Sequence, residues 1–175
     1  MRKDVLNNSL VITFVLAISS VGYGQTVMDK RVVPGKIKVD RSLQFDTSKI
    51  AILPFHKNDS WVFQKNCIPA KLIQADLTMI QKLLIGCIDE YNRSVRSNRI
   101  DFTIDLKQHN YKMQIVAVIN SRGEKEVWVN CFCEVSDDKW KKNVLLVFDG
   151  GSCFFHLKMN LTTNKFFDLA VNGVA

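Results

Sequence analysis

The most regular hydrophobic pattern in the chain lies near its middle. Apolar residues follow Asp76 in steps of three and four, at Leu77, Ile80, Leu84, Cys87, Ile88, Tyr91 and Val95. This spacing places them along one side of an α-helix, and aspartate is a common capping residue at a helix N-terminus. The pattern predicts one long helix that begins at Asp76 and ends near Ser97-Asn98.

A different pattern fills the chain after this helix. Apolar and polar residues alternate in five short runs, Tyr111–Ile119, Glu126–Val135, Val144–Phe148, Cys153–Leu161 and Lys165–Val171. Alternation with a period of two is typical of β-strands. The links between the runs are too short for a parallel crossover, which needs about a dozen residues or more. The pattern therefore predicts an antiparallel meander of five strands.

Three segments precede the helix. Residues 25–48 are polar and basic, which indicates an extended lead-in, and Ile50–Leu53 is an apolar run ended by Pro54, typical of a strand near a sheet edge. Residues 56–71 show no period and are predicted to be mostly loop. We expect residues 49–175 to form a single α+β domain, in which one main helix packs its apolar stripe on the five-stranded meander. This order of elements resembles the cystatin-like and NTF2-like folds.

The first 24 residues have the pattern of a segment that directs a protein to another compartment. Arg2-Lys3 is followed by the uncharged apolar run Leu10–Ile18, and Gly22 and Gly24 stand at the −3 and −1 positions of a cut before Gln25. A basic start, a short apolar run and small residues at the cut are typical of a secretory signal peptide. The run is far shorter than the ~20 residues that span a bilayer. We expect an exported protein, periplasmic or secreted, with no transmembrane span after cleavage of 1–24.

Composition and charge narrow the range of partners. Hydrophobic residues make up 47% of the chain, which is enough for a core and excludes general disorder. The formal net charge of +7 favours acidic partners, but export argues against nucleic acid. The densest basic cluster is a candidate binding surface for a phosphate, sulfate or lipid headgroup, and consists of Lys139, Trp140, Lys141 and Lys142. Asp137 and Asp138 precede it, so a solvated link is the simpler interpretation.

The five cysteines have an odd count, so at least one thiol stays unpaired in an oxidising compartment. Cys67 and Cys87 are the pair we expect first, because a loop before a helix can fold back on it. Cys131 and Cys133 share one face of a predicted strand at ~6.5 Å, near the upper limit for a bridge. We expect them as small buried hydrophobes, with a bridge to Cys67, Cys87 or Cys153 as the alternative. No zinc-finger spacing accompanies them, so we expect no metal or cofactor.

Catalytic patterns are incomplete. The stretch Gly151–Phe154 resembles the cysteine-protease sequence C-G-S-C-W, but Cys153 here begins a predicted strand, and a downstream His and Asn at the protease spacing are absent. His156 is the one candidate catalytic base. Alternation places it on the solvent side of its strand, and the carboxylate it needs would be Asp149 or Asp168. We therefore expect no assembled catalytic site.

A more specific resemblance involves four strings in the second half of the chain. They are Gly123–Cys133 (GEKEVWVNCFC), Trp140–Lys142 (WKK), Asp149–Phe154 (DGGSCF) and Lys158–Thr163 (KMNLTT). Together they resemble a family of uncharacterised exported proteins from Bacteroidota, over roughly the last third of the chain. The resemblance implies an envelope location and no known activity.

These observations favour an exported, non-catalytic α+β module that binds an unknown protein or envelope component through its sheet or loops. Two alternatives stay open. One is a small NTF2-like hydrolase or isomerase, whose pocket lies between helix and sheet with His156 or a buried carboxylate as base. The other is a secreted inhibitor or immunity-type protein that forms a one-to-one complex with an enzyme.

Overall fold

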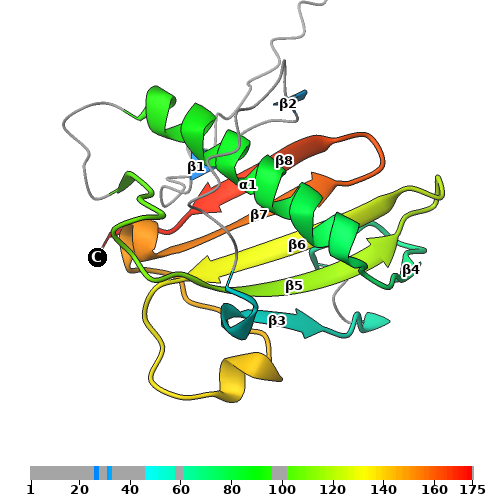
Figure 1. Cartoon of the computed structure of the whole chain (residues 1–175), viewed down its shortest axis with the longest axis horizontal. Helices are drawn as coiled ribbons and strands as arrows, with labels where there is room; N and C mark the ends of the chain where they lie inside the picture. The colour runs from blue at the N-terminus through cyan, green and yellow to red at the C-terminus, as the bar shows by residue number, and fades with distance from the viewer. Residues whose placement is uncertain (1–25, 28–30, 33–45, 58–60, 96–101, 175) are drawn as a thin grey trace, which may run out of the picture.

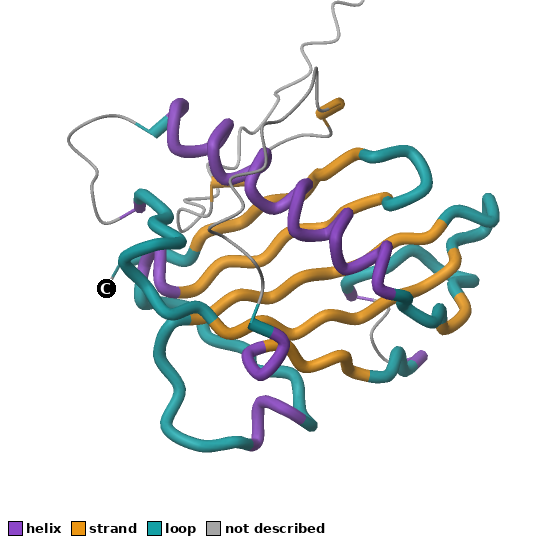
Figure 2. The backbone as a smooth tube through the Cα atoms, viewed as in Figure 1, coloured by secondary structure: helices purple, strands orange, loops and turns teal. Residues whose placement is uncertain are grey.

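The computed structural model describes residues 26–27, 31–32, 46–57, 61–95 and 102–174. The expected signal peptide, 1–24, and most of the expected lead-in, 25–48, lie outside these residues. In the described part of the chain, one α-helix crosses one face of one β-sheet (Figures 1 and 2). No helix there combines the length and the apolarity that crossing a bilayer requires.

The elements follow one another in an α+β order. The strands and the helix are β1 (Thr26–Val27), β2 (Arg31–Val32), β3 (Ile50–Leu53), β4 (Ile68–Pro69), α1 (Gln74–Ser94), β5 (Lys112–Ile119), β6 (Lys125–Phe132), β7 (Phe154–Asn160) and β8 (Lys165–Val171). Short 3₁₀ turns are η2 (Thr47–Lys49), η5 (Lys139–Lys141) and η6 (Gly151–Cys153). The expected α+β class with one main helix on a mostly antiparallel sheet is confirmed.

The strands are arranged in the order β1-β8-β7-β6-β5-β3, with β2 also paired to β8 and β4 to β5. Strands β5 to β8 are antiparallel neighbours, as the short links predict. Strand β3 differs, because it runs parallel to β5, with Ile50 opposite Met113 and Leu53 opposite Val116. The long connection that contains α1 makes this parallel pairing possible.

The prediction of a strand at Val144–Phe148 is wrong. The antiparallel meander of β5 to β8 therefore has four strands in place of five. This segment is irregular, and side-chain amides of the sheet pair with its backbone where a strand would need a neighbour. The Leu145 N–H donates to the side-chain oxygen Oε1 of Gln114 at 2.9 Å, and Asn130 Nδ2 donates to the Leu145 carbonyl at 2.7 Å. Because these amides satisfy the backbone, the alternating apolar pattern of the segment does not lead to a strand.

Helix α1 starts two residues earlier than predicted, at Gln74, and ends at Ser94. Asp76 is therefore not the cap residue itself. Its carboxylate accepts from the backbone N–H of Ile73 at 2.9 Å and pairs with Lys125 Nζ at 2.8 Å, which holds the start of the helix to β6. Five residues of the predicted stripe are buried, Ile80, Leu84, Cys87, Ile88 and Tyr91, whereas Leu77 and Val95 are only partly buried. Leu83 and Ile85 are buried as well.

Each face of the sheet carries its own core. Under α1 the side chains are mainly aliphatic, and include Met113, Ile115, Val127, Val129, Leu157 and Met159. The opposite face is richer in aromatic residues, and its core includes Val116, Val118, Trp128, Phe132, Phe63 and Trp140. Residues 61–69 and the loop 133–153 contribute to this second core. We call the two sides the helix face and the loop face.

Candidate ligand groove

Two neighbouring hollows lie on the loop face, above β6, β7 and β8. Trp61 and His156 line both of them. The larger part, about 410 Å³, is lined mainly by the loop residues Leu145, Leu146, Val147 and Phe148 together with Phe154. The smaller part, about 160 Å³, is lined by Trp128, Lys158 and Asp168 among others. We call both parts together the Trp61 groove.

The floor of the groove follows from strand register. His156 in β7 lies opposite Asn130 in β6 and opposite Ala170 in β8. Its chain neighbours Phe155 and Leu157 point into the helix-face core, so alternation directs His156 to the loop face. The sequence prediction placed His156 on the solvent side of its strand. The structure has it on the loop face, where it is half-buried because Trp61 and Trp128 lie beside it.

One wall of the groove is aromatic. The Trp61 and Trp128 rings meet edge to face, with centroids 5.4 Å apart and planes at 79°. Trp128 is buried and also lies 6.0 Å from the His156 ring. Trp61 is 55% exposed. The buried Trp128 ring therefore supports the Trp61 ring, which remains accessible to a ligand.

Apolar side chains form the other wall. Leu146 is 54% exposed and Phe148 is 82% exposed. The described residues include seven large hydrophobic side chains that are exposed, and three of them, Trp61, Leu146 and Phe148, line this one hollow. Gathered apolar exposure around a concave site is typical of a binding surface, whereas single exposed residues are ordinary.

The smaller part of the groove contains a charged pair among apolar residues and carries little net charge. Lys158 Nζ pairs with Asp168 Oδ2 at 3.0 Å, so the two charges compensate each other. Burial, and then the neighbouring Lys158 ammonium, hold the pKa of His156 below its usual value, against the opposing effect of Asp168. This shift of the pKa favours the neutral imidazole. Asp168 stands at a β-bulge with a φ of +54°, a backbone conformation that Asp and Asn tolerate better than most residues.

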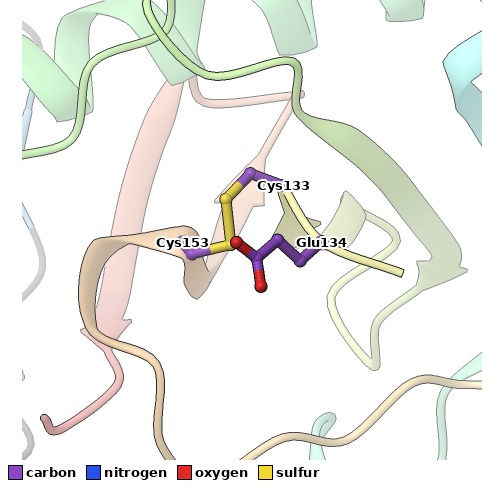
Figure 3. A group of neighbouring side chains, drawn as sticks. All are labelled: Cys133, Glu134 and Cys153. Atoms are coloured by element: carbon purple, nitrogen blue, oxygen red, sulfur yellow. A yellow bond between two sulfur atoms is a disulfide. The ribbon is translucent and has the colours of Figure 1, made fainter. Parts of the chain in front are cut away.

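The loop that forms the apolar wall is held at its base by a disulfide. Cys133 follows β6, Cys153 precedes β7, and their sulfurs are bonded (Figure 3). Gln114, fully buried on the loop face, donates from Nε2 to the carbonyls of Trp140 at 2.5 Å and Asn143 at 2.6 Å. Asn172 Nδ2 donates to the carbonyl of Val147 at 2.6 Å. Bridge and amides together set the position of the groove wall.

The expected pairing of Cys67 with Cys87 does not occur in the structure. Both are free thiols, and they lie on opposite sides of the sheet: Cys87 is in the helix-face core, while Cys67 packs on the loop-face core. The bridge Cys133–Cys153 is one of the alternatives that the sequence left open. Cys131 is a small buried residue as predicted, and burial raises the pKa of its thiol and of Cys87.

The basic cluster Lys139, Trp140, Lys141 and Lys142 does not present its aromatic ring to a partner. Trp140 is only 3% exposed, because it packs edge-on against Phe132 with centroids 5.5 Å apart. Lys139 pairs with Asp137 at 3.2 Å and Lys141 with Asp138 at 3.1 Å. Trp140 thus anchors the loop, and the charges of Lys139 and Lys141 are compensated by the aspartates that precede them.

A metal site at the disulfide is not supported by its chemistry. Ligand atoms of Cys133, Glu134 and Cys153 lie within 4.8 Å of one another (Figure 3). Both sulfurs belong to the bridge, and a metal takes the free thiolate as ligand. The group is therefore a bridge with a neighbouring carboxylate.

The hydrolase or isomerase alternative places its pocket between helix and sheet, with His156 or a buried carboxylate as base. Among the described residues, the buried side chains of the helix-face core pack together between α1 and the sheet. His156, the candidate base, lies on the other face. Of the two carboxylates considered for it, Asp168 shares the smaller hollow with His156 but is paired with Lys158.

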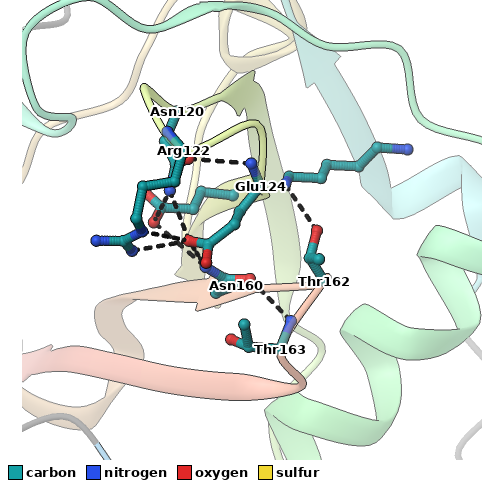
Figure 4. A network of polar contacts seen from close by, with 8 residues as sticks. Asn120, Arg122, Glu124, Asn160, Thr162 and Thr163 are labelled. Atoms are coloured by element: carbon teal, nitrogen blue, oxygen red, sulfur yellow. Dashed lines mark hydrogen bonds and ion pairs between the residues drawn. The ribbon is translucent and has the colours of Figure 1, made fainter.

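A polar network at one end of the sheet braces two turns (Figure 4). Glu124 accepts from Arg122 Nη2 at 2.7 Å, from Asn120 Nδ2 at 2.9 Å and from Asn160 Nδ2 at 2.9 Å. The Arg122 hydrogen bond and then that of Asn120 lower the pKa of Glu124 to about 2. Since its bonds link the β5–β6 turn to the end of β7, we interpret this network as structural.

Sequence reasoning missed most of the groove. Trp61 lies in a segment without a period, and Leu146 and Phe148 were assigned to a strand. The available signal was polar: Gln114 and Asn130 interrupt otherwise apolar strands, which indicates that something other than a packed helix covers that face.

Comparison of the chain with protein families, with curated proteins and with solved structures yields no match. The resemblance of the last third to exported proteins of Bacteroidota stays a prediction. The Trp61 groove is therefore the feature of the molecule from which a function can be inferred.

Proposed function

We propose that this chain is an exported, non-catalytic binding module of the bacterial envelope that holds its partner in the Trp61 groove. The observation that carries the proposal is the convergence of Trp61, Leu146 and Phe148, all exposed, on one hollow of about 410 Å³. Binding pockets of this size are mainly apolar and contain a few polar groups that orient the ligand. The Trp61 groove has both the apolar surface and the polar groups.

The way the groove is held supports binding. Its loop wall has no regular secondary structure between η5 and η6, yet the Cys133–Cys153 bridge and the Gln114 amide tether it. A wall that is already ordered loses little conformational entropy when a ligand arrives. The exposed apolar residues are thus presented by a pre-formed surface.

Export is supported by two independent features. The pattern of residues 1–24 is typical of a secretory leader. A disulfide such as Cys133–Cys153 persists in oxidising compartments and is rare in the cytosol. The resemblance to exported Bacteroidota proteins points to the same location.

The proposal is tested by isolating the protein from the cells that produce it and recording native mass spectra. The variant Leu146→Ser removes apolar surface inside the groove, and Ile52→Ser is its matched control, since both side chains are 54% exposed and Ile52 lies on β3. We expect a bound species that is retained by Ile52→Ser and reduced about tenfold or more by Leu146→Ser, from the loss of one buried apolar side chain.

A bound species that is equally reduced by both variants, or by neither, would overturn the assignment of function to the groove. If the groove-dependent species is an enzyme in a one-to-one complex, the inhibitor or immunity-type alternative describes the protein better. If it is a small molecule or an envelope component, the binding-module proposal stands as stated.

A further inference from the structure

The two ends of the Trp61 groove differ in chemistry, and this difference describes the ligand. At the larger end, Leu146, Phe148 and Phe154 offer apolar surface. At the smaller end, Lys158 supplies a donor, Asp168 an acceptor, and His156 lies between them and the larger end. Trp61 belongs to both ends, so a ligand that fills the groove has an apolar part and a polar part joined beside this ring.

The polar end favours an uncharged group. Lys158 and Asp168 compensate each other at 3.0 Å, so neither an anion nor a cation finds an unopposed countercharge there. What the pair does offer is a donor beside an acceptor. Hydroxyl groups match this arrangement, because each hydroxyl both donates and accepts.

The position of the groove argues against an extended peptide. Its floor strands β6 and β7 are inner strands, and each is paired on both sides. Peptides that bind to sheets add a strand at a free edge, where backbone groups are available. The face of an inner strand offers only side chains, which suits a compact ring.

We propose that the Trp61 groove takes an uncharged glycoside, with its sugar ring beside Trp61 and the Lys158–Asp168 pair and its apolar substituent against Leu146 and Phe148. The inference rests on the proposed function and adds the ligand class. A pyranose has an apolar C–H face that stacks on an aromatic ring and a rim of hydroxyls that both donate and accept. The exposed Trp61 ring, supported from behind by Trp128, provides that stacking surface.

The test is calorimetric titration of the full chain with three ligands, each below its micelle concentration. Octyl glucoside carries both parts of the proposed ligand, glucose carries only the ring, and octanoate joins a similar chain to a charged head. We expect saturable binding of octyl glucoside, with glucose and octanoate each at least about tenfold weaker, because one lacks the apolar part and the other has an unmatched charge. Octanoate binding as tight as octyl glucoside would overturn the proposal.

Asp168→Asn gives a response that a purely structural role would not give. Asparagine tolerates the positive φ of this position, so the bulge is preserved. The change leaves the Lys158 charge uncompensated, so we expect octanoate to gain about tenfold in affinity while octyl glucoside weakens. Asp137→Asn, which removes a carboxylate paired with Lys139 outside the groove, is the control and should change neither affinity.

The variant Trp61→Ala distinguishes binding of octyl glucoside in the Trp61 groove from adsorption of the detergent elsewhere on the protein. Octyl glucoside binding should fall at least about tenfold in this variant, because the stacking surface is lost. Binding that persists unchanged would place the glycoside elsewhere and overturn the inference. If no glycoside binds but Leu146→Ser still removes the species found in cells, the ligand class is wrong and the groove function stands; if both experiments fail, both proposals are wrong.

Discussion

The two faces of the sheet are covered in different ways, and the Trp61 groove lies on the loop face. A helix covers the helix face, and a mostly irregular loop covers much of the loop face. A helix pairs its own backbone groups, so the surface beneath it is free to be entirely apolar and tightly filled. An irregular segment needs partners for its backbone, and the sheet must supply them.

The residues of the two faces show this difference. Under α1, strand residues such as Ile115, Val129 and Leu157 are fully buried and aliphatic. On the loop face, Gln114 and Asn130 occupy opposed positions of β5 and β6 and bond to the loop backbone. These polar positions pair with the backbone of the loop, and residues of the same loop line the Trp61 groove.

The largest effect is expected from a cavity on the helix face. Leu157→Ala should lower the free energy of unfolding by about 3 kcal/mol, because Leu157 is fully buried and its surroundings relax only partly. The exposed Leu146→Ala on the loop face should stay within about 0.5 kcal/mol. Urea denaturation of both variants measures the contrast. Equal losses would show that the loop face is as tightly packed as the helix face.

Removal of the bridge is expected to rank second. Cys133 and Cys153 are 20 positions apart, and a loop of that length contributes about 3 kcal/mol when cross-linked, in the chain-entropy account. The double variant Cys133→Ser, Cys153→Ser should lose this stability and also weaken binding in the groove, since the wall is no longer closed. Guanidinium unfolding with and without a thiol reductant measures it. A reductant effect that persists in the double variant would assign the loss to something other than this bridge.

Gln114→Leu tests the amide tether of the loop. The variant keeps a side chain of similar size but leaves the Leu145 N–H and the Trp140 and Asn143 carbonyls without their partner. We expect a loss of about 2 kcal/mol in the free energy of unfolding. Gln64→Leu, at an exposed position, is the control. A neutral Gln114→Leu would mean that the loop holds its position without the sheet amides.

The smallest effect concerns pH on the loop face. The pKa of His156 is lowered in the folded protein, so the unfolded chain binds more protons as pH falls below the usual value of 6.5. Stability therefore falls as the pH is lowered from about 7 to about 5. His156→Gln should make this decline shallower, in thermal unfolding followed across that range. An unchanged pH dependence would show that His156 is not the group responsible.

The hydrophobic pattern along the chain was sufficient to predict the helix and the antiparallel strands of the second half. The steps of three and four after Asp76 predicted α1, and period-two alternation predicted β5 to β8 with their antiparallel order. These predictions hold because side-chain spacing decides which residues share a face, whatever the rest of the chain does. The same spacing placed His156 on the solvent side of its strand, whereas Trp61 and Trp128 leave it half-buried.

The tertiary structure alone decided what covers each face. Val144–Phe148 has the alternation of a strand but lies on the sheet as a loop, since Gln114, Asn130 and Asn172 pair with its backbone. Cys133 is bonded to Cys153 because β6 and β7 are neighbouring strands, whereas the sheet separates Cys67 from Cys87. The Trp61 groove joins segments far apart in the chain, and such contacts depend on the packed fold, which the spacing of residues along one segment does not encode.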